Sequence, residues 1–228
     1  MTKSVTDVYR IVRGRIMSGH YRPGSHLTEA ELSAELEVSR TPVRAALRKL
    51  GEDGLVTVVP NRGAFVAEWT RSDIDEVYQL RSLLESRAAG LAADRRSEGN
   101  VRDLTGLTEE MGQLVRERPA SYRDELMRNN REFHLLILES ARSPRLFSIG
   151  RGLADTSVTL GTWYHYNNDD IARSLNHHRE IVNAIGLGSV EVARALMMAH
   201  METAHEAFMR RFLPAARNDH PLGGEASD

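Results

Sequence analysis

The chain has 228 residues, of which 41% are hydrophobic and 27% are charged, and its formal net charge is -2. This composition is typical of a folded globular protein and excludes a disordered, collagen-like or low-complexity chain. The absence of cysteine excludes disulfide scaffolds, thiolate metal sites and cysteine nucleophiles. The first residues lack the apolar core of a signal peptide and no apolar run could span a bilayer, so we expect a cytoplasmic protein without membrane contact.

The first part of the chain is predicted to contain three short helices and a hairpin. Apolar periodicity, a capping pattern at Thr28 and a proline in the first turn of the third helix indicate the helices. In chain order, the elements are helices over 5–18 and 28–37, a helix from Ser39, and a strand, turn and strand over 55–59, 60–63 and 64–67. These are the parts of a winged helix-turn-helix, which we place at residues 1–68.

The third predicted helix carries a row of arginines. Arg40, Arg44 and Arg48 are four residues apart and therefore share one face, with Thr41 beside the first. Arginine and threonine in the first turns suit a helix that enters the major groove of DNA. The alternative is a solvated basic face on a small helical domain.

The predicted hairpin turn carries a second basic residue. Arg62 lies at the tip between Asn61 and Gly63, where it can reach a minor groove or a phosphate. Residues 1–68 also carry ten Lys and Arg against eight Asp and Glu, whereas the remainder of the chain is acidic. This mild asymmetry favours a polyanionic partner for the first domain.

The rest of the chain is predicted to be entirely helical. We expect one domain over residues 72–213, with helices over about 73–93, 101–117, 121–141, 144–163, 169–187 and 190–212. Six helices with short connections form a compact bundle, so the fold class is mainly α: a winged helix-turn-helix followed by an all-α bundle. The segment 214–228 is expected to be a disordered tail.

Three histidines lie where the helical pattern requires apolar residues. His134, His178 and His200 occupy core-facing positions on three different helices, and Asn130 lies one turn before His134. Neutral imidazoles are good ligands for Zn, Ni, Fe or Mn, and facing helices are where bundles build such sites. Three protein nitrogens leave positions open for water or an anion. The alternative is that each histidine is a hydrogen-bonded core residue.

The first domain resembles the GntR family of bacterial transcription regulators. The resemblance rests on the residues of the third helix and the hairpin, at 38–47, 54–56 and 60–66. It implies that operator DNA is contacted by Arg40, Thr41 and Arg44 and by the wing residues Asn61, Arg62 and Gly63. Ala30 departs from the family pattern, because many relatives carry a DNA-contacting arginine at this position.

The second domain resembles the ligand-binding domain (FCD type) of the FadR subfamily, on residues 73–81, 132–134, 178–181 and His200. Many members bind a divalent metal through one aspartate and three histidines, and a small carboxylate effector completes the coordination. The resemblance assigns the histidine ligands to His134, His178 and His200, and Asn130 stands at the aspartate position.

The asparagine changes the chemistry that the resemblance implies. An amide is a weaker ligand than a carboxylate and brings no negative charge, so metal affinity should fall and a bound ion would keep its full charge for an anion. The opposing interpretation is that the site holds no metal. Partly protonated histidines, Asn130 and Arg81 would then bind a carboxylate directly.

The residues and the resemblance together predict a homodimeric transcription regulator whose operator affinity is controlled by a small organic-acid or amino-acid-like effector. The resemblance implies repression relieved by the ligand, and activation is the alternative. Two-fold symmetry would match a pseudo-palindromic operator on double-stranded DNA. One alternative is a DNA-binding regulator that responds to no ligand. Another is a metal-dependent enzyme, which we disfavour because no general base accompanies the histidines.

Overall fold

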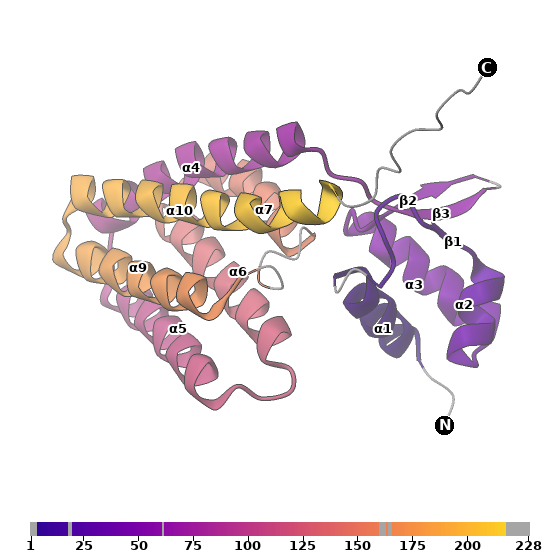
Figure 1. The fold of residues 1–228 in the computed structure, drawn as a ribbon. Helices are drawn as coiled ribbons and strands as arrows, with labels where there is room; N and C mark the ends of the chain where they lie inside the picture. Colours follow the sequence, from indigo (N-terminus) through magenta and orange to yellow (C-terminus); the bar gives the residue numbers. More distant parts are fainter. Residues whose placement is uncertain (1–3, 18–19, 61, 160–162, 164–165, 218–228) are drawn as a thin grey trace, which may run out of the picture.

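The structure is a computed structural model that describes residues 4–17, 20–60, 62–159, 163 and 166–217. Figure 1 shows a small N-terminal unit of helices and strands beside a larger helical bundle. The described residues form two separate hydrophobic cores, one within residues 8–66 and one within residues 74–209. Two cores in one chain support two folding units.

The N-terminal unit contains the predicted helices and hairpin together with one strand that the sequence did not predict. Its elements are α1 (Val5–Met17), β1 (His26–Leu27), α2 (Glu29–Leu36), α3 (Arg40–Glu52), β2 (Val56–Val59) and β3 (Gly63–Val66). The three strands form an antiparallel sheet in the order β1-β3-β2, in which His26 pairs with Phe65. A two-residue strand has no alternating pattern of its own, so only its partner β3 defines it.

Helix α2 begins and ends through local interactions. The Thr28 side chain accepts a hydrogen bond from the Glu31 amide over 3.1 Å, which is the expected cap. Glu37 ends the helix in a left-handed conformation with φ 57° and starts the tight turn into α3. Apolar residues of α1, α2 and α3 meet across this turn in the core, among them Val8, Val12, Leu32, Leu36, Val43 and Leu50.

The second unit is the predicted bundle. Within the described residues it has six helices: α4 (Arg71–Asp94), α5 (Glu98–Glu117), α6 (Tyr122–Ser140), α7 (Pro144–Thr159), α9 (Asn168–Leu187) and α10 (Val190–Arg217). Thr70 and Asn167 begin α4 and α9 with capping boxes. Each helix therefore lies close to its predicted position.

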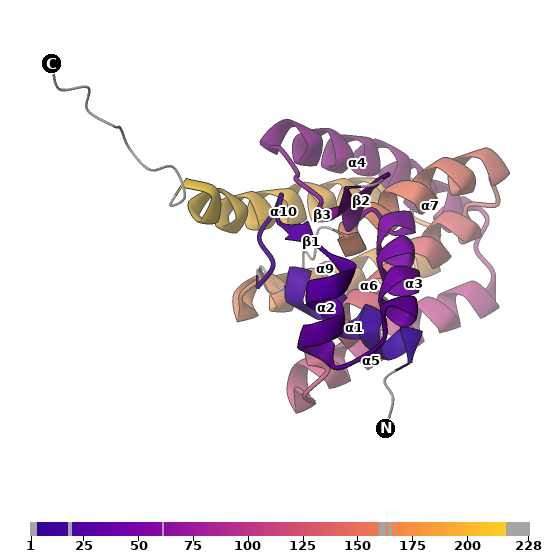
Figure 2. The ribbon, with the colours of Figure 1, turned by 90° about the vertical axis from the view of Figure 1, so that its right-hand side faces the viewer.

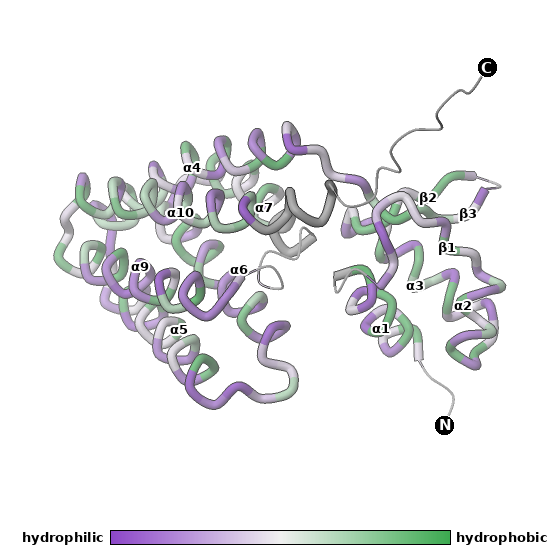
Figure 3. Tube along the Cα trace, in the orientation of Figure 1, coloured by the Kyte–Doolittle hydropathy of each residue, from purple (hydrophilic) through white to green (hydrophobic). Residues whose placement is uncertain are grey.

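The two ends of the bundle's chain lie next to each other. Helices α4 and α10 run side by side along one edge of the bundle in Figure 1, and they make the most extensive helix contact in the molecule. Figure 3 shows polar and apolar residues alternating along the helices, as amphipathic helices require. Figure 2 views the molecule from the side of the small unit, with α1, α2 and α3 nearest the viewer.

Two expectations at helix ends need correction. Helix α10 continues past Phe212 to Arg217, so residues 214–217 are helical and not part of a disordered tail. Proline disfavours a helix interior by about 3 kcal/mol, so it is a common stop signal, but it does not forbid a helix from continuing through Pro214. The segment 218–228 lies outside the described residues, as do 160–162 at the predicted end of the fourth bundle helix. No described helix is long and apolar enough to cross a membrane.

Candidate functional site

Helix α3 presents its predicted basic face to solvent. Arg40, Thr41, Arg44 and Arg48 are all exposed on α3. The opposite face packs into the core through Val43, Leu47 and Leu50, which are at most 6% exposed. The helix is therefore fixed by its apolar side and leaves its arginines available for a polyanionic partner.

Arg44 is held by a partner that the sequence analysis missed. Its Nε and Nη2 donate to the two carboxylate oxygens of Glu29 on α2, over 2.6 and 2.7 Å. The Arg44 side chain is nevertheless 73% exposed. The hydrogen bonds from Arg44 lower the pKa of Glu29. This pair orients the guanidinium, and Glu29 competes with any phosphate or guanine that approaches it.

The wing turn is shaped by a glycine with a left-handed backbone. Gly63 has φ +90°, and a Cβ atom there would lie 2.7 Å from Nε2 of His26. The same Nε2 is hydrogen-bonded to the carbonyl oxygen of Arg62 over 2.6 Å, and the His26 ring stacks on Phe65. Gly63 is therefore required by the backbone, while the exposed Arg62 remains available at the tip. Asn61, also expected to contact DNA, lies outside the described residues.

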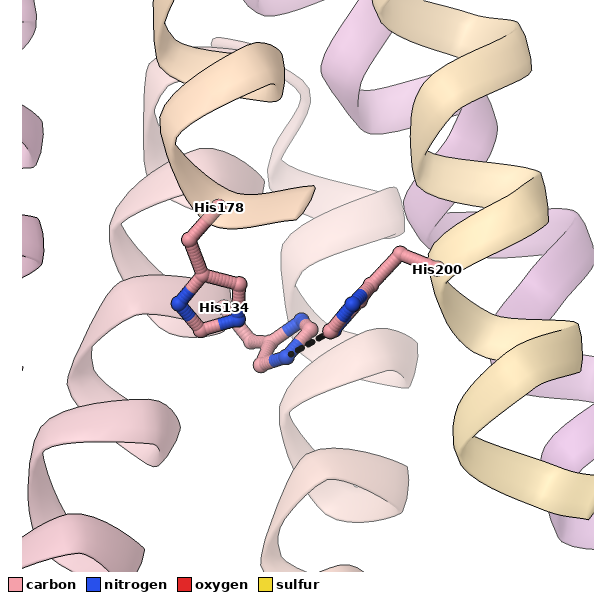
Figure 4. Close-up of side chains that lie close together, drawn as sticks. All are labelled: His134, His178 and His200. Carbon is pink, nitrogen blue, oxygen red and sulfur yellow. Dashed lines mark hydrogen bonds between the residues drawn. The ribbon is translucent and has the colours of Figure 1, made fainter. Parts of the chain in front are cut away.

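The structure brings the three predicted histidines together inside the bundle. His134 on α6, His178 on α9 and His200 on α10 are at most 3% exposed. One ring nitrogen from each lies within 4.8 Å of the other two. Figure 4 shows the three rings converging from three helices, with His134 and His200 joined through their Nε2 atoms at 3.4 Å.

A buried carboxylate supports one of these rings. Oε2 of Glu85 on α4 lies 2.5 Å from Nδ1 of His134, and Oε1 accepts a hydrogen bond from Nε of Arg81 over 2.7 Å. Burial opposes the ionised form of Glu85, but the charge of Arg81 and the contacts with Arg81 and His134 outweigh it and lower the pKa of Glu85 to about 2. Glu85 is thus ionised, although it is 1% exposed.

Burial disfavours the charged form of His178 and of His200. Burial lowers the pKa of His178 and of His200 well below the ordinary value of 6.5, and the neighbouring imidazoles lower both further. Neither ring nitrogen of His178 has a hydrogen-bond partner among the described residues, and the ring stacks on Phe133 with centroids 3.8 Å apart. A buried imidazole with unsatisfied nitrogens is costly unless something binds it.

This donor set fits a divalent metal ion. Neutral imidazole nitrogens converge from three helices, and a carboxylate bound to the far nitrogen of one ring is the usual support of a metal-binding histidine. Asn130 is half-buried and lines the same cavity as His134 and His200. The cavity holds about 20 Å³, which suits a water molecule or an ion but is too small for an organic acid without movement of its walls.

Arg81, Trp163 and Tyr166 also line this cavity. Arg81 is 4% exposed and contributes to the wall, and its Nε donates a hydrogen bond to Glu85. Nη1 of Arg123 on α6 donates to the carbonyl oxygens of Trp163 and Tyr166, over 2.5 and 3.0 Å, and holds both residues over the cavity. Tyr164 and His165, which lie between Trp163 and Tyr166 in the chain, are outside the described residues.

Two other histidines flank the cluster. The centroid of the His177 ring lies 5.7 Å from that of His200, and His177 is half-buried at the edge of the cluster. His205 is hydrogen-bonded to Asp75 over 2.8 Å and stacks on Tyr78, so it joins α10 to α4.

Glu85 and Glu29 were missed by the sequence analysis, for different reasons. Glu85 follows Arg81 by four residues on a core-facing stripe that also contains Tyr78 and Ala89, so the helical pattern alone could have located it. Glu29 meets Arg44 only because α2 and α3 pack across the turn, and no spacing in the sequence indicates this.

Two family models match the chain in consecutive segments. Residues 5–66 match the bacterial regulatory proteins of the gntR family, and residues 76–203 match the FCD domain. The Nta operon transcriptional regulator of Aminobacter aminovorans is 27% identical to this chain, over 82% of the chain and 85% of the relative.

Solved structures share the architecture. E. coli McbR/YncC has a TM-score of 0.68 and 22% identity, over 93% of this chain and 100% of that chain. A GntR transcriptional regulator from Rhodococcus sp. RHA1 has a TM-score of 0.63 and 27% identity, over 90% of this chain and 97% of that chain.

Proposed function

Because this chain belongs to the GntR family of bacterial regulatory proteins and carries an FCD domain, we propose that it is a homodimeric repressor released from its operator by a small carboxylate effector. The matched relatives are transcriptional regulators and not enzymes, and GntR regulators bind operator DNA and effector ligands and are typically dimers. The observation that carries the effector part of the proposal is the buried cluster of three histidines.

Operator binding is assigned to the N-terminal unit, residues 1–68. Exposed Arg40, Thr41 and Arg44 on α3 support insertion of this helix into a major groove, and Arg62 at the wing supports a backbone or minor-groove contact. Asn61 and Gly63 are assigned to the same wing. A protein that acts on chromosomal DNA works in the cytoplasm of a bacterium, so we propose that location.

Dimerisation is assigned to the helical unit, residues 72–213. Leu80 and Leu83 on α4 are 41% and 65% exposed, and Ile149 on α7, which packs against α4, is 59% exposed. Large apolar side chains that face solvent on two neighbouring helices support an interface between two copies of the chain. A two-fold axis there would present two α3 helices to two half-sites.

The histidine cluster is assigned to a divalent metal ion of the Zn, Ni, Fe or Mn class. His134, His178 and His200 would hold the ion through ring nitrogens, and Asn130 could add its carbonyl oxygen. The ion would supply a positive charge for a carboxylate. Because Asn130 brings no negative charge to this wall of the cavity, an anionic ligand is favoured over a neutral one.

The effector is assigned to the same cavity, with the lining residues Arg81, Asn130, His134 and His200 as its polar contacts and His178 next to them in the cluster. An organic acid or an amino-acid-like ligand must displace part of the wall, because the cavity holds only about 20 Å³. That displacement would link ligand binding to the position of α6. The link matters only if the ligand binds the two arrangements with different affinities.

Metal content is the first measurement. The protein, purified without chelators or an affinity metal, is analysed for elements, and titration calorimetry with zinc then gives a stoichiometry. We expect one ion per chain in the wild type and a large loss in His178→Ala. If the wild type binds no ion but is stabilised by organic acids in a thermal-shift screen, the metal site is wrong. The histidines and Arg81 would then bind the acid directly.

Operator control is the second measurement. A binding site selected from random duplex DNA is titrated by fluorescence anisotropy, at several salt concentrations and with each acid that stabilises the protein. We expect affinity to fall steeply as salt rises and to fall further with the active acid. Unchanged affinity with every stabilising acid would favour a regulator that responds to no ligand.

A further inference from the structure

We propose that Glu85 is the positioning residue of the histidine cluster: it fixes the ring of His134 for metal binding and supplies the negative charge that Asn130 does not. The proposal rests on the metal site proposed above. Glu85 is buried on α4, a helix that carries none of the three histidines.

The contact between Glu85 and His134 determines which ring nitrogen can bind a metal. Oε2 of Glu85 lies 2.5 Å from Nδ1 of His134, so Nδ1 carries a hydrogen and donates a hydrogen bond to the carboxylate oxygen. Nε2 of His134 then keeps its lone pair. This same Nε2 is the atom that lies 3.4 Å from Nε2 of His200, inside the cluster.

Arg81 pairs with the carboxylate in the interior. Its Nε donates to Oε1 of Glu85 over 2.7 Å, so the two oxygens of Glu85 have different partners. Burying a carboxylate is costly unless it is paired and hydrogen-bonded, and Glu85 has a guanidinium at one oxygen and an imidazole at the other. A continuous row of hydrogen bonds therefore leads from Arg81 through Glu85 to His134 in the cluster.

The negative charge of Glu85 compensates for the charge that Asn130 does not bring to the metal site. Three imidazoles and the amide of Asn130 are all neutral ligands, so they do not offset the charge of a divalent ion. Glu85 lies one imidazole ring away from the ion position and makes His134 a stronger electron donor. Glu85, which would not touch the ion, thus takes over part of the role that a metal-binding carboxylate at position 130 would have.

The first test compares zinc affinity in the full-length protein, measured by competition with a chromophoric chelator. Glu85→Gln should weaken zinc binding by about 10- to 100-fold, the usual effect of removing such a support. Glu76→Gln, at an exposed position on the same helix, is the matched control and should leave affinity unchanged. Equal affinities of Glu85→Gln and wild type would overturn the proposal while the metal site stands.

Two further variants separate positioning from a purely structural role. Glu85→Asp keeps a carboxylate beside Arg81 but withdraws it from His134, so it should fold and still lose affinity. Asn130→Asp restores a charged ligand, so the loss caused by Glu85→Gln should be smaller in that background. Strictly additive effects of Asn130→Asp and Glu85→Gln would contradict the exchange of charge between the two positions.

A final readout needs no metal. Nitrogen-15 correlation spectra of the metal-free protein report which ring nitrogen carries the proton. We expect His134 to be protonated at Nδ1 in the wild type and to become a mixture in Glu85→Gln. A wild type with the proton at Nε2 refutes the positioning role, even if zinc binds. A wild type that binds no zinc refutes both metal assignments, and protonation at Nδ1 would then limit Glu85 to orienting His134.

Discussion

Arg13 on α1 donates a hydrogen bond to Oδ1 of Asp124 on α6 over 3.1 Å, and its other terminal nitrogen lies 3.5 Å from the sulfur of Met127. Met127 lines the histidine cavity, and α6 also carries His134. One arginine of the DNA-binding unit therefore touches the helix that forms a wall of the effector site. This contact is a physical route by which displacement of α6 can reach α3, because α1 packs directly on α3.

Asp124→Asn should reduce the coupling between the two units. The Arg13–Asp124 pair is partly exposed, so we expect the free energy of unfolding to change by no more than about 1 kcal/mol. The change in operator affinity caused by the active acid should become smaller, while affinity for the acid in the absence of DNA stays the same. Anisotropy titrations of the operator with and without the acid measure the change in affinity. The control is Glu132→Gln, at an exposed position on the same helix.

Arg44→Ala should weaken operator binding by at least about fivefold, because it removes a guanidinium from the groove-facing side of α3. The melting temperature should hardly change, since the Arg44 side chain is 73% exposed. Arg102→Ala, an exposed change on α5, is the control. Wild-type affinity of Arg44→Ala for the selected operator would show that α3 does not read the groove.

Leu83→Glu should convert the dimer to a monomer. The leucine is 65% exposed on α4, and a charge at its position would be buried without a partner in the proposed interface. Sedimentation velocity should show half the mass, and operator affinity should fall because only one half-site contact remains. The matched control is Leu187→Glu on α9, which is 69% exposed on another helix. A dimeric Leu83→Glu protein places the interface elsewhere.

Acid should destabilise the metal-free protein. In the folded state the pKa of His178 and of His200 lies well below 6.5, whereas both take their ordinary value in the unfolded chain. Below about pH 6.5 the unfolded state therefore binds more protons, and the unfolding free energy falls by up to about 1.4 kcal/mol per pH unit for each ring. Melting temperatures in a chelator between about pH 7.5 and 5.5 should fall with pH, and less so in His178→Leu.

Chelation should lower the stability of the wild type at neutral pH. An ion that binds only the folded state stabilises it by about 2.7 kcal/mol at a free concentration of 100 times Kd. The melting temperature should therefore fall when a chelator is added, and zinc should restore it. In His178→Leu, which lacks one ligand, the chelator should have much less effect. An equal fall in both proteins would point to a different binding site for the ion.

The sequence by itself determined where the helices lie in the chain and which side of each helix is buried. Apolar periodicity located α1 to α3 and the bundle helices, because one buried stripe per helix is sufficient to define each of them. The same stripes turned His134, His178 and His200 inward, since a position on a stripe sets the direction of its side chain. The arginines of α3 and the wing predicted a DNA partner, and the resemblance to a family on the same residues supported it.

Only the tertiary structure decided which side chains from different helices meet. The contact of Glu85 with His134 joins α4 to α6, and that of Glu29 with Arg44 joins α2 to α3. Periodicity fixes the direction of a side chain around its own helix axis, but not its height or its neighbour across the interface. Those depend on how the helices pack against one another, and packing is a property of all the side chains in the interface together.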